Sequence, residues 1–318
     1  MDDELSQWEE LRGERVFLTG GTGFIGRSLL EALTAHGALV TILSRNPAPN
    51  LGIEVHRGDV RTFPFPQGEF PFVIHAAADV SNLHRPDAAL DLFDTIVNGT
   101  RRVLDFASCH GAKKLLFVSS GAVYGLQPAD LTHIPDDFTG APDPTDPHSA
   151  YGEAKRAAEM LCALYGQRHG MEIKIARCFA FAGAGLPLDG AFALGNFIRD
   201  AMAGGPIRVR GDGTARRSYL DVADLAHWLS TILLAGKAGR TYNVGSEHDI
   251  SLADLAHTVA RTLHPEAVVT IAQAPVPGSS PARYVPSTAR ARTELGLREN
   301  ISLPDAILRT AKRTAGKP

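Results

Sequence analysis

The stretch Thr19-Gly20-Gly21-Thr22-Gly23-Phe24-Ile25-Gly26 decides the fold. It follows a short apolar run that ends at Thr19, and it precedes a segment with helical spacing. Gly20 permits a tight turn, Gly23 lets the backbone approach a pyrophosphate, and Gly26 lets the helix rest on the strand. The first turn of that helix offers free N–H groups and a positive dipole end to phosphate. This strand, turn and helix predict a dinucleotide-binding site.

The segments on either side of this turn alternate between apolar runs and helical patterns. Strands that are apolar throughout and alternate with helices predict a parallel sheet covered on both faces. We therefore expect an α/β fold, a Rossmann-type doubly wound parallel sheet, with a smaller C-terminal α/β substrate-binding domain. The expected strands are 15–19, 38–43, 52–56, 72–75, 114–119 and 172–177, and the main helices 24–36, 98–110 and 149–169.

The pattern changes after the last of these strands, where a glycine-rich loop over 183–190 begins. We expect a dinucleotide-binding domain over residues 1–178 and a substrate domain over 179–318. A segment near 219–245 is expected to return and pack on the sheet.

Composition excludes several classes of protein. The 318 residues are 44% hydrophobic and 21% charged, which is typical of a globular chain with a sizeable core. A net charge of −3 gives no basic surface for nucleic acid, and no apolar run reaches the roughly 20 residues that span a bilayer. Cys109, Cys162 and Cys178 form no CxxC pair, and the histidines show no metal-ligand spacing. We expect a soluble cytoplasmic enzyme without a metal and without nucleic-acid or membrane partners.

The residues at the end of the second strand, Leu43-Ser44-Arg45, indicate which dinucleotide binds. A carboxylate at this place holds the adenine ribose of NAD, whereas an arginine accepts the 2′-phosphate of NADP. Because no acid stands here and Arg45 can form paired hydrogen bonds with phosphate, we favour NADP and keep NAD as possible. Asp59, after the third strand, is expected to lie against the adenine amino group.

Three side chains carry the expected chemistry. Tyr151 and Lys155 lie four residues apart and therefore share one helix face, and Ser120 follows the strand at 114–119. An ammonium about 4 Å from the phenol contributes roughly 4 kcal/mol to the phenolate at an effective dielectric of about 20. We expect this attraction to lower the pKa of Tyr151 by about 3, which makes it a usable general acid or base. Ser120 is expected to polarise the same substrate oxygen.

These motifs resemble those of the extended short-chain dehydrogenase/reductases, in the branch of nucleotide-sugar epimerases, dehydratases and reductases. The resemblance covers nearly the whole chain and implies that Ser120, Tyr151 and Lys155 form the catalytic triad. The matching segments are 20–26, 75–78, 119–125, 151–155, 211–213, 217–219 and 242–245.

The resemblance also implies the binding residues. The NADP cofactor, or NAD, is expected to contact Gly20, Gly23, Phe24, Ile25, Gly26, Ser44, Arg45, Asp59, Val60, Ala76, Ala77, Ala78, Asn98 and Lys155. A nucleotide-diphosphate sugar substrate is expected to contact Asn196, Val209, Arg217 and Arg283, with Arg217 on the pyrophosphate. We interpret Arg216 as surface charge. Ala180 stands where the family often has an asparagine that contacts the sugar, so Phe181 and the loop after it are candidates for specificity.

Departures from the family pattern favour one reaction. The 4,6-dehydratases of this type carry an Asp-Glu pair where this chain has Gly121 and Ala122, and neither of these can transfer a proton. A reductase must exchange its spent cofactor, which suits NADPH, whereas an epimerase retains NAD. We therefore favour a 4-ketoreductase that acts on a nucleotide-linked 4-keto-6-deoxysugar, and keep a nucleotide-sugar 4-epimerase as the alternative.

Two other classes explain the residues less well. A reductase of hydrophobic ketones gives Arg217 and Arg283 nothing to bind. A regulatory protein without catalysis has no reason to keep the serine, tyrosine and lysine together.

By resemblance we also expect a homodimer that forms through the helix at 149–169. Its alanine-rich face, with Ala154, Ala157 and Ala158, permits close approach of another helix. We interpret Met160 and His75 as packing residues.

Overall fold

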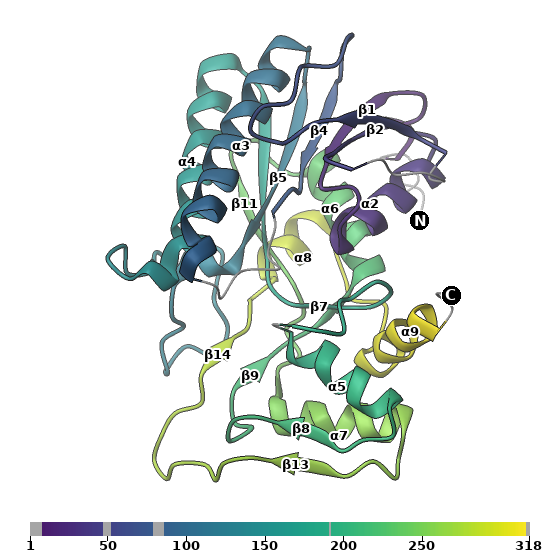
Figure 1. Cartoon of the computed structure of the whole chain (residues 1–318). Helices are drawn as coiled ribbons and strands as arrows, with labels where there is room; N and C mark the ends of the chain where they lie inside the picture. The colour runs from purple at the N-terminus through teal and green to yellow at the C-terminus, as the bar shows by residue number, and fades with distance from the viewer. Residues whose placement is uncertain (1–7, 47–51, 79–85, 191, 316–318) are drawn as a thin grey trace.

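The main feature of the fold is a seven-stranded parallel sheet, seen in a computed structural model that describes residues 8–46, 52–78, 86–190 and 192–315 (Figure 1). The strand order is β3-β2-β1-β4-β5-β6-β11. This is the order of a doubly wound dinucleotide-binding sheet extended by one strand, and it confirms the expected fold class. The strands are β1 (Arg15–Thr19), β2 (Leu39–Ser44), β3 (Glu54–Arg57), β4 (Phe72–His75), β5 (Lys114–Ser120), β6 (Glu172–Cys178) and β11 (Thr241–Val244).

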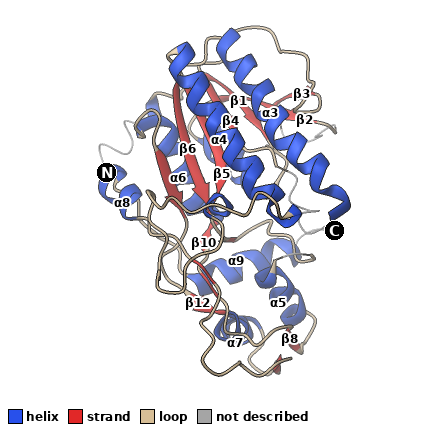
Figure 2. Ribbon diagram, turned by 90° about the vertical axis from the view of Figure 1, so that its left-hand side faces the viewer, coloured by secondary structure: helices blue, strands red, loops and turns tan. Residues whose placement is uncertain are grey.

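Helices cover both faces of this sheet (Figure 2). On one face lie α3 (Ala89–Cys109) and α4 (Ala150–His169), which pack against each other and enclose a core rich in phenylalanine. On the other face lie α2 (Phe24–Ala35) and α6 (Val222–Ala235) over a second core. Burial on both faces explains why the central strands are apolar throughout rather than alternating.

The segment after residue 219 returns to the sheet. α6 packs on β5 and β6, and β11 pairs with β6 in parallel at the edge. The chain thus forms part of the smaller lobe in the lower half of Figure 1, returns to the sheet through α6 and β11, and then completes the smaller lobe.

A smaller lower lobe has its own apolar core. α5 (Ala193–Met202), α7 (Leu252–Leu263) and α9 (Leu303–Ala315) pack together there with a two-stranded sheet of β8 (Ile207–Val209) and β13 (Val269–Ile271). Short strands join the lobes: β7 (Phe181–Ala182) pairs with β10 (Leu220–Asp221), and β9 (Arg216–Arg217) lies between β12 (Ile250–Ser251) and β14 (Arg283–Tyr284). Also described are α8 (Ala289–Leu295) and short 3-10 turns at Pro86–Ala88, Gly121–Tyr124 and Pro147–Ser149.

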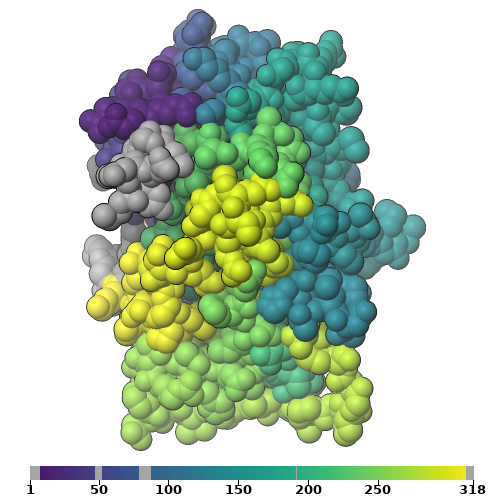
Figure 3. Space-filling model, turned by 180° about the vertical axis from the view of Figure 1, so that it is seen from behind, coloured from purple at the N-terminus to yellow at the C-terminus, as the bar shows by residue number. Residues whose placement is uncertain are grey.

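The C-terminal segment lies against the junction of the two lobes. α9 contacts β7 and β10 as well as α5 and α7, and Figure 3 shows this yellow segment across the middle of the molecule from behind. α8 packs on β11 and α6 in the upper lobe.

Two expectations about packing are changed by the structure. Met160 is 61% exposed on α4, so it is a surface residue and not a core residue. Ala154 and Ala158 are fully buried within the chain itself, in the core under α4, so the face they form is not available to a second subunit. Within the described ranges, no helix combines the length and the apolar character needed to cross a membrane.

Candidate active site

The glycine turn after β1 is tightly packed. Gly20 has a φ of 76°, and a Cβ there would lie 2.7 Å from the carbonyl oxygen of Ala76. A Cβ on Gly26 would clash with the carbonyl oxygen of Gly20. Both positions therefore require glycine, one for its conformation and one for the close contact between helix and turn.

The N-terminus of α2 is open to a ligand. Its N-cap is Gly23, which is exposed and supplies no side-chain cap, so the first N–H groups of the helix receive no side-chain acceptor from that residue. Phe24 and Ile25 follow and pack against the cores below. A diphosphate fits here, because it is a polyanion of the size that a helix N-terminus and a glycine turn accommodate.

The residues expected around the adenosine lie at the same edge of the sheet. Ser44 is buried, and its hydroxyl donates to the carbonyl oxygen of Asn46, while Arg45 is exposed next to it. Arg61 holds Asp59 through its backbone and side chain, and this arginine is the main cause of the lowered pKa of Asp59. Both carboxylate oxygens of Asp59 thus accept hydrogen bonds from Arg61, two residues further along the chain.

The strand next to the glycine turn supplies the other wall. Ala77 donates its backbone N–H to the Thr19 hydroxyl (3.2 Å), which keeps the segment Ala76 to Ala78 beside the turn. His75 is fully packed: one ring nitrogen lies 2.7 Å from the Thr19 hydroxyl and the other 3.1 Å from the Thr100 hydroxyl. Burial lowers the pKa of His75 to about 3, so the ring is neutral, as expected for a packing residue.

Two further expected cofactor residues lie on and under α3. Asn98 is exposed on this helix. Val60 is buried and contacts the helix at Gly99, where a Cβ would lie 2.8 Å from the Val60 side chain. The structure therefore brings Val60 close to Asn98.

Ser120 and Tyr151 meet at the carboxyl end of β5. Gly152 allows this approach, because a Cβ there would lie 2.7 Å from the carbonyl oxygen of Ala122 in the turn after Ser120. The Ser120 hydroxyl accepts from the backbone N–H of Ala122 (3.1 Å), and it lies close enough to Tyr151 to act on the pKa of that phenol in the lowering direction. The start of α4 is thus packed against the end of β5, and this packing brings the hydroxyl groups of Tyr151 and Ser120 close together.

Lys155 lies one helical turn further along α4 and is almost completely buried. Its ammonium donates to the carbonyl oxygen of Val118 (2.8 Å) and lies 4.8 Å from the centre of the Phe117 ring. Burial lowers the pKa of Lys155 to about 8.

These contacts correct the expected effect of Lys155 on the phenol. Burial raises the pKa of Tyr151 to about 12, and the hydrogen bond from Ser120 acts in the lowering direction. The predicted lowering by Lys155 is therefore wrong for this arrangement, because the ammonium is directed to the backbone of β5 and burial dominates at the phenol. Tyr151 is a protonated phenol at neutral pH.

The two arginines expected at the substrate phosphates lie on opposite faces of a small sheet. β14 pairs in parallel with β9, so Arg283 lies beside Arg216 and Tyr284 lies beside Arg217. Arg216 and Arg283 both bind the carboxylate of Asp249. Arg217 lies on the other face, with its guanidinium carbon 5.8 Å from the centre of the Tyr284 ring. Arg217 therefore faces the Ser120 side, and Arg283 is occupied by Asp249.

The remaining expected substrate residues lie in the lower lobe. The Asn196 side chain donates to the Gly190 carbonyl oxygen (3.0 Å) and accepts from Arg199 (3.1 Å), so it ties α5 to the preceding loop. Val209 is only 3% exposed and belongs to the core of the lower lobe, because β8 directs Ile207 and Val209 inward. The Val209 side chain is therefore not placed to contact a substrate, in contrast to the sequence-based expectation.

Tyr284 is a site residue that the sequence did not reveal. Its hydroxyl lies 3.5 Å from that of Ser120, although 164 positions separate the two residues. The available signal was the alternation in Ala282-Arg-Tyr-Val-Pro286, which places Tyr284 on the face opposite to Arg283.

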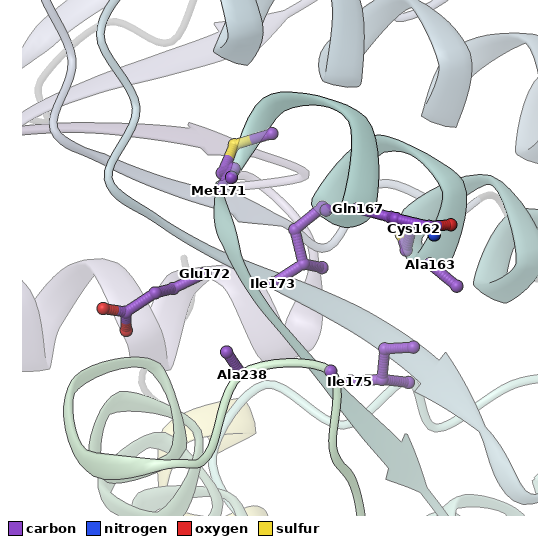
Figure 4. A pocket seen from close by; sticks show the side chains of 11 residues that line it. Cys162, Ala163, Gln167, Met171, Glu172, Ile173, Ile175 and Ala238 are labelled. Atoms are coloured by element: carbon purple, nitrogen blue, oxygen red, sulfur yellow. The ribbon is translucent and has the colours of Figure 1, made fainter.

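A cavity of about 410 Å³ lies elsewhere, between the last turns of α4, the start of β6 and the loop near Gly239 (Figure 4). Its lining includes Cys162, Met171 and Ile173. Because β6 begins here, this cavity lies at the opposite end of the sheet from Ser120. Across the part of the chain that the structure describes, no three His, Cys, Asp or Glu side chains are grouped as metal ligands.

The fold and site define a class: a Rossmann-fold dinucleotide enzyme whose serine and tyrosine lie at the same end of the parallel sheet as the glycine turn. Comparison with known proteins narrows this class. Residues 16–245 match the model of the NAD dependent epimerase/dehydratase family. The chain belongs to this family and is an enzyme of the extended short-chain dehydrogenase/reductase type, which confirms the resemblance seen in the sequence.

Similar proteins act on different nucleotide sugars. The chain is 30% identical to UDP-glucuronic acid decarboxylase 2 of Arabidopsis thaliana over 306 residues, which cover 93% of this chain and 67% of that protein. It is 25% identical to dTDP-glucose 4,6-dehydratase of Streptomyces niveus over 318 residues, covering 94% and 92%. The structure of UDP-glucose 4-epimerase of Thermus thermophilus in complex with NAD superposes with a TM-score of 0.79 at 25% identity, covering 96% and 100%.

Proposed function

We propose that this enzyme reduces the C4 carbonyl of a nucleotide-linked 4-keto-6-deoxysugar with NADPH. The observation that carries this proposal is the approach of Ser120 and Tyr151 at the carboxyl end of β5, the same end of the sheet at which the glycine turn after β1 fits a diphosphate. Ligands of open α/β sheets bind at this end.

The proton transfer follows from the state of the phenol. When bound in the crevice, NADPH would supply hydride for the carbonyl carbon. Tyr151, whose pKa is about 12, is protonated at neutral pH and gives its proton to the carbonyl oxygen, which becomes the hydroxyl of the product. Ser120 donates a hydrogen bond to the same oxygen and stabilises the charge that develops on it. The phenolate that remains takes up a proton from solvent.

The residues beside Ser120 argue against dehydration. Gly121 and Ala122 carry no group that transfers a proton. A Cβ at position 121 would lie 2.7 Å from the Phe179 ring and 2.8 Å from the Tyr284 hydroxyl, so the space for an acidic side chain there is already filled. We therefore place this enzyme among those that change the oxidation state or configuration of one carbon.

The preference for NADP is supported by the end of β2. Ser44 and Arg45 stand there in place of an acid, and Arg45 is an exposed residue whose guanidinium can form paired hydrogen bonds with a 2′-phosphate. A carboxylate at this position would repel that phosphate.

A 4-epimerase is the second candidate. The specific observation in its favour is the similarity to the Thermus thermophilus UDP-glucose 4-epimerase, whose structure contains NAD. An epimerase uses the same serine and tyrosine, but its cofactor is unchanged at the end of each cycle.

The proposed substrate class rests on Arg217 and on the names of the similar proteins. UDP-glucuronic acid, dTDP-glucose and UDP-glucose are all sugars linked to a nucleoside diphosphate. Arg217, on the Ser120 side of β9, is the cation that we assign to the pyrophosphate.

We also propose a homodimer that forms through the outer face of α4. Met160 is 61% exposed and Leu164 is 53% exposed, and these residues lie one turn apart on this helix. Light scattering of the wild type and of Met160→Lys/Leu164→Lys tests this assignment: the wild type should have the mass of two chains, and the variant that of one.

The reaction itself is tested by an assay that separates the two candidates. UDP- or dTDP-4-keto-6-deoxyglucose with NADPH should give a 6-deoxyhexose and consume one NADPH per product. UDP-glucose without added cofactor should give no UDP-galactose by NMR. Mass spectrometry of the purified protein should find no tightly held NAD. Retained NAD together with formation of UDP-galactose would make the enzyme an epimerase instead.

A further inference from the structure

Tyr284 contributes a second phenol to the place where Ser120 and Tyr151 meet. Its hydroxyl lies 3.5 Å from the Ser120 hydroxyl and can donate to the carbonyl oxygen of Cys178, which is also 3.5 Å away. Its ring lies 4.6 Å from that of Phe179, which holds the phenol in this direction. Both contacts of the hydroxyl are long, as catalytic hydrogen bonds commonly are before a substrate is bound.

Ser120 is therefore bounded by polar groups on three sides. The backbone N–H of Ala122 donates to its oxygen, Tyr151 lies on one side and Tyr284 on the other. A serine hydroxyl has a single proton to donate. The phenol of Tyr284 also has one proton, and it has two acceptors at the same distance, the Cys178 carbonyl oxygen and the Ser120 oxygen. When this proton is donated to the Ser120 oxygen, the serine proton points toward Tyr151 and the reacting oxygen.

Gly121 leaves room for the hydroxyl of Tyr284 because it has no side chain. A Cβ on Gly121 would lie 2.8 Å from the Tyr284 hydroxyl, which is closer than such atoms approach in proteins. The glycine next to the catalytic serine and the tyrosine of β14 are thus complementary in shape. The residue that meets Ser120 from this side comes from β14 and not from the segment after β5.

Tyr284 also lies on the substrate side of its strand. It shares a face of the small sheet with Arg217, which we assign to the pyrophosphate, while its hydroxyl reaches the residue that we assign to the carbonyl. The sugar has to lie between these two groups, so Tyr284 stands beside the reacting part of the substrate.

We propose that Tyr284 is a positioning residue, which donates to the Ser120 oxygen and directs the serine proton toward the carbonyl oxygen of the sugar. This inference rests on the proposed roles of Ser120 and Tyr151. Tyr284→Phe keeps the ring against Phe179 and removes only the hydroxyl. The loss of one hydrogen bond of ordinary strength lowers kcat roughly 3- to 10-fold and leaves the dissociation constant of the cofactor unchanged.

A double-mutant cycle with Ser120→Ala tests whether Tyr284 acts through the serine. In the Ser120→Ala background, Tyr284→Phe should change kcat by less than about 1.5-fold, because the group that it positions is gone. A merely structural role would lower kcat by the same factor in both backgrounds and would contradict the proposal. An unchanged kcat in Tyr284→Phe would contradict it as well.

Two further variants keep this test decisive. Tyr165→Phe is the matched control, since it removes a phenol that donates to Asp105 between α3 and α4, and it should leave kcat unchanged. Tyr284→Met replaces Tyr284→Phe if the latter does not fold, with the same expected loss. If Ser120→Ala and Tyr151→Phe both keep full activity, the proposed function fails; if they lose activity and only the coupling is absent, the inference about Tyr284 alone fails.

Discussion

Gly121 and Tyr284 are complementary: the place of a side chain on Gly121 is taken by the hydroxyl of Tyr284, 2.8 Å from where a Cβ would stand. The ring of Phe179 closes the same space at 2.7 Å. The shape of the site beside Ser120 is therefore set jointly by the turn after β5 and by β14, one of the strands that join the two lobes. A family member with an acid at this position must arrange that strand differently.

Gly121→Ala should lower both stability and activity. The added methyl group forces the rings of Phe179 and Tyr284 to move, and overpacking of this kind typically costs about 1–3 kcal/mol. Urea unfolding measures this loss. Phe179→Leu makes room for the methyl group, so the double variant Gly121→Ala/Phe179→Leu should be more stable than the sum of the two single changes predicts. Strict additivity would show that the two positions do not share this space.

Arg217→Met should weaken the binding of the nucleotide sugar and leave the cofactor unaffected. A hydrogen bond to a charged group contributes about 1.5–3 kcal/mol, so KM should rise roughly 10- to 100-fold. Arg216→Met is the matched control, because Arg216 lies on the opposite face and binds Asp249. A larger effect of Arg283→Met than of Arg217→Met would restore the sequence-based prediction that Arg283 holds phosphate, and would overturn the assignment by strand face.

Arg45→Asp should reverse the preference between the two dinucleotides. The carboxylate repels a 2′-phosphate but can accept hydrogen bonds from a ribose. The measurement is the dissociation constant of 2′,5′-ADP against that of 5′-AMP, which needs no turnover. The wild type should bind 2′,5′-ADP more tightly by at least about 10-fold, and the variant should bind 5′-AMP more tightly. Equal affinity of the wild type for both would exclude NADP specificity.

His75 should make the fold sensitive to acid. Its pKa is lowered from 6.5 to about 3 by burial, so the unfolded chain binds a proton between these values that the folded chain does not. Stability is therefore complete above about pH 6.5 and is lost as the pH falls toward 3, by as much as roughly 5 kcal/mol.

Urea unfolding between pH 7 and about 4.5 measures this dependence. His75→Asn should lose stability at neutral pH, because the bonds to Thr19 and Thr100 change, but should show a shallower dependence on pH by up to about 1.4 kcal/mol per pH unit. The exposed His148→Asn is the control for removal of a histidine. Equal slopes in the wild type and His75→Asn would contradict a buried neutral ring.

Much of the fold could be predicted because its signals are local. The six expected strands and the helix after the glycine turn were found close to their predicted ends, since buried parallel strands are continuously apolar and glycines mark the turns. α3, in contrast, begins at Ala89 and not near Asn98. Its first two turns bury only one side, with Leu92 and Ile96, so their pattern is weaker than that of the rest of the helix.

The site was predicted less completely because its geometry depends on distant contacts. The meeting of Ser120 and Tyr151 follows from the ends of β5 and α4, which the sequence indicates. The direction of Lys155 depends on a backbone carbonyl of β5 that the helical spacing does not reveal. Tyr284 and the face of Arg283 depend on the two-residue strand β14, which is too short to recognise from periodicity.

In the proposed reaction the Tyr151 hydroxyl gives its proton to the substrate carbonyl, and Tyr151→Phe removes this proton donor while keeping the ring. Steady-state reduction of a nucleotide-linked 4-keto-6-deoxysugar by NADPH should be slower in this variant by a factor of about 100 to 10,000, while NADPH binds with unchanged affinity. A variant that keeps the turnover of the wild type would contradict the account.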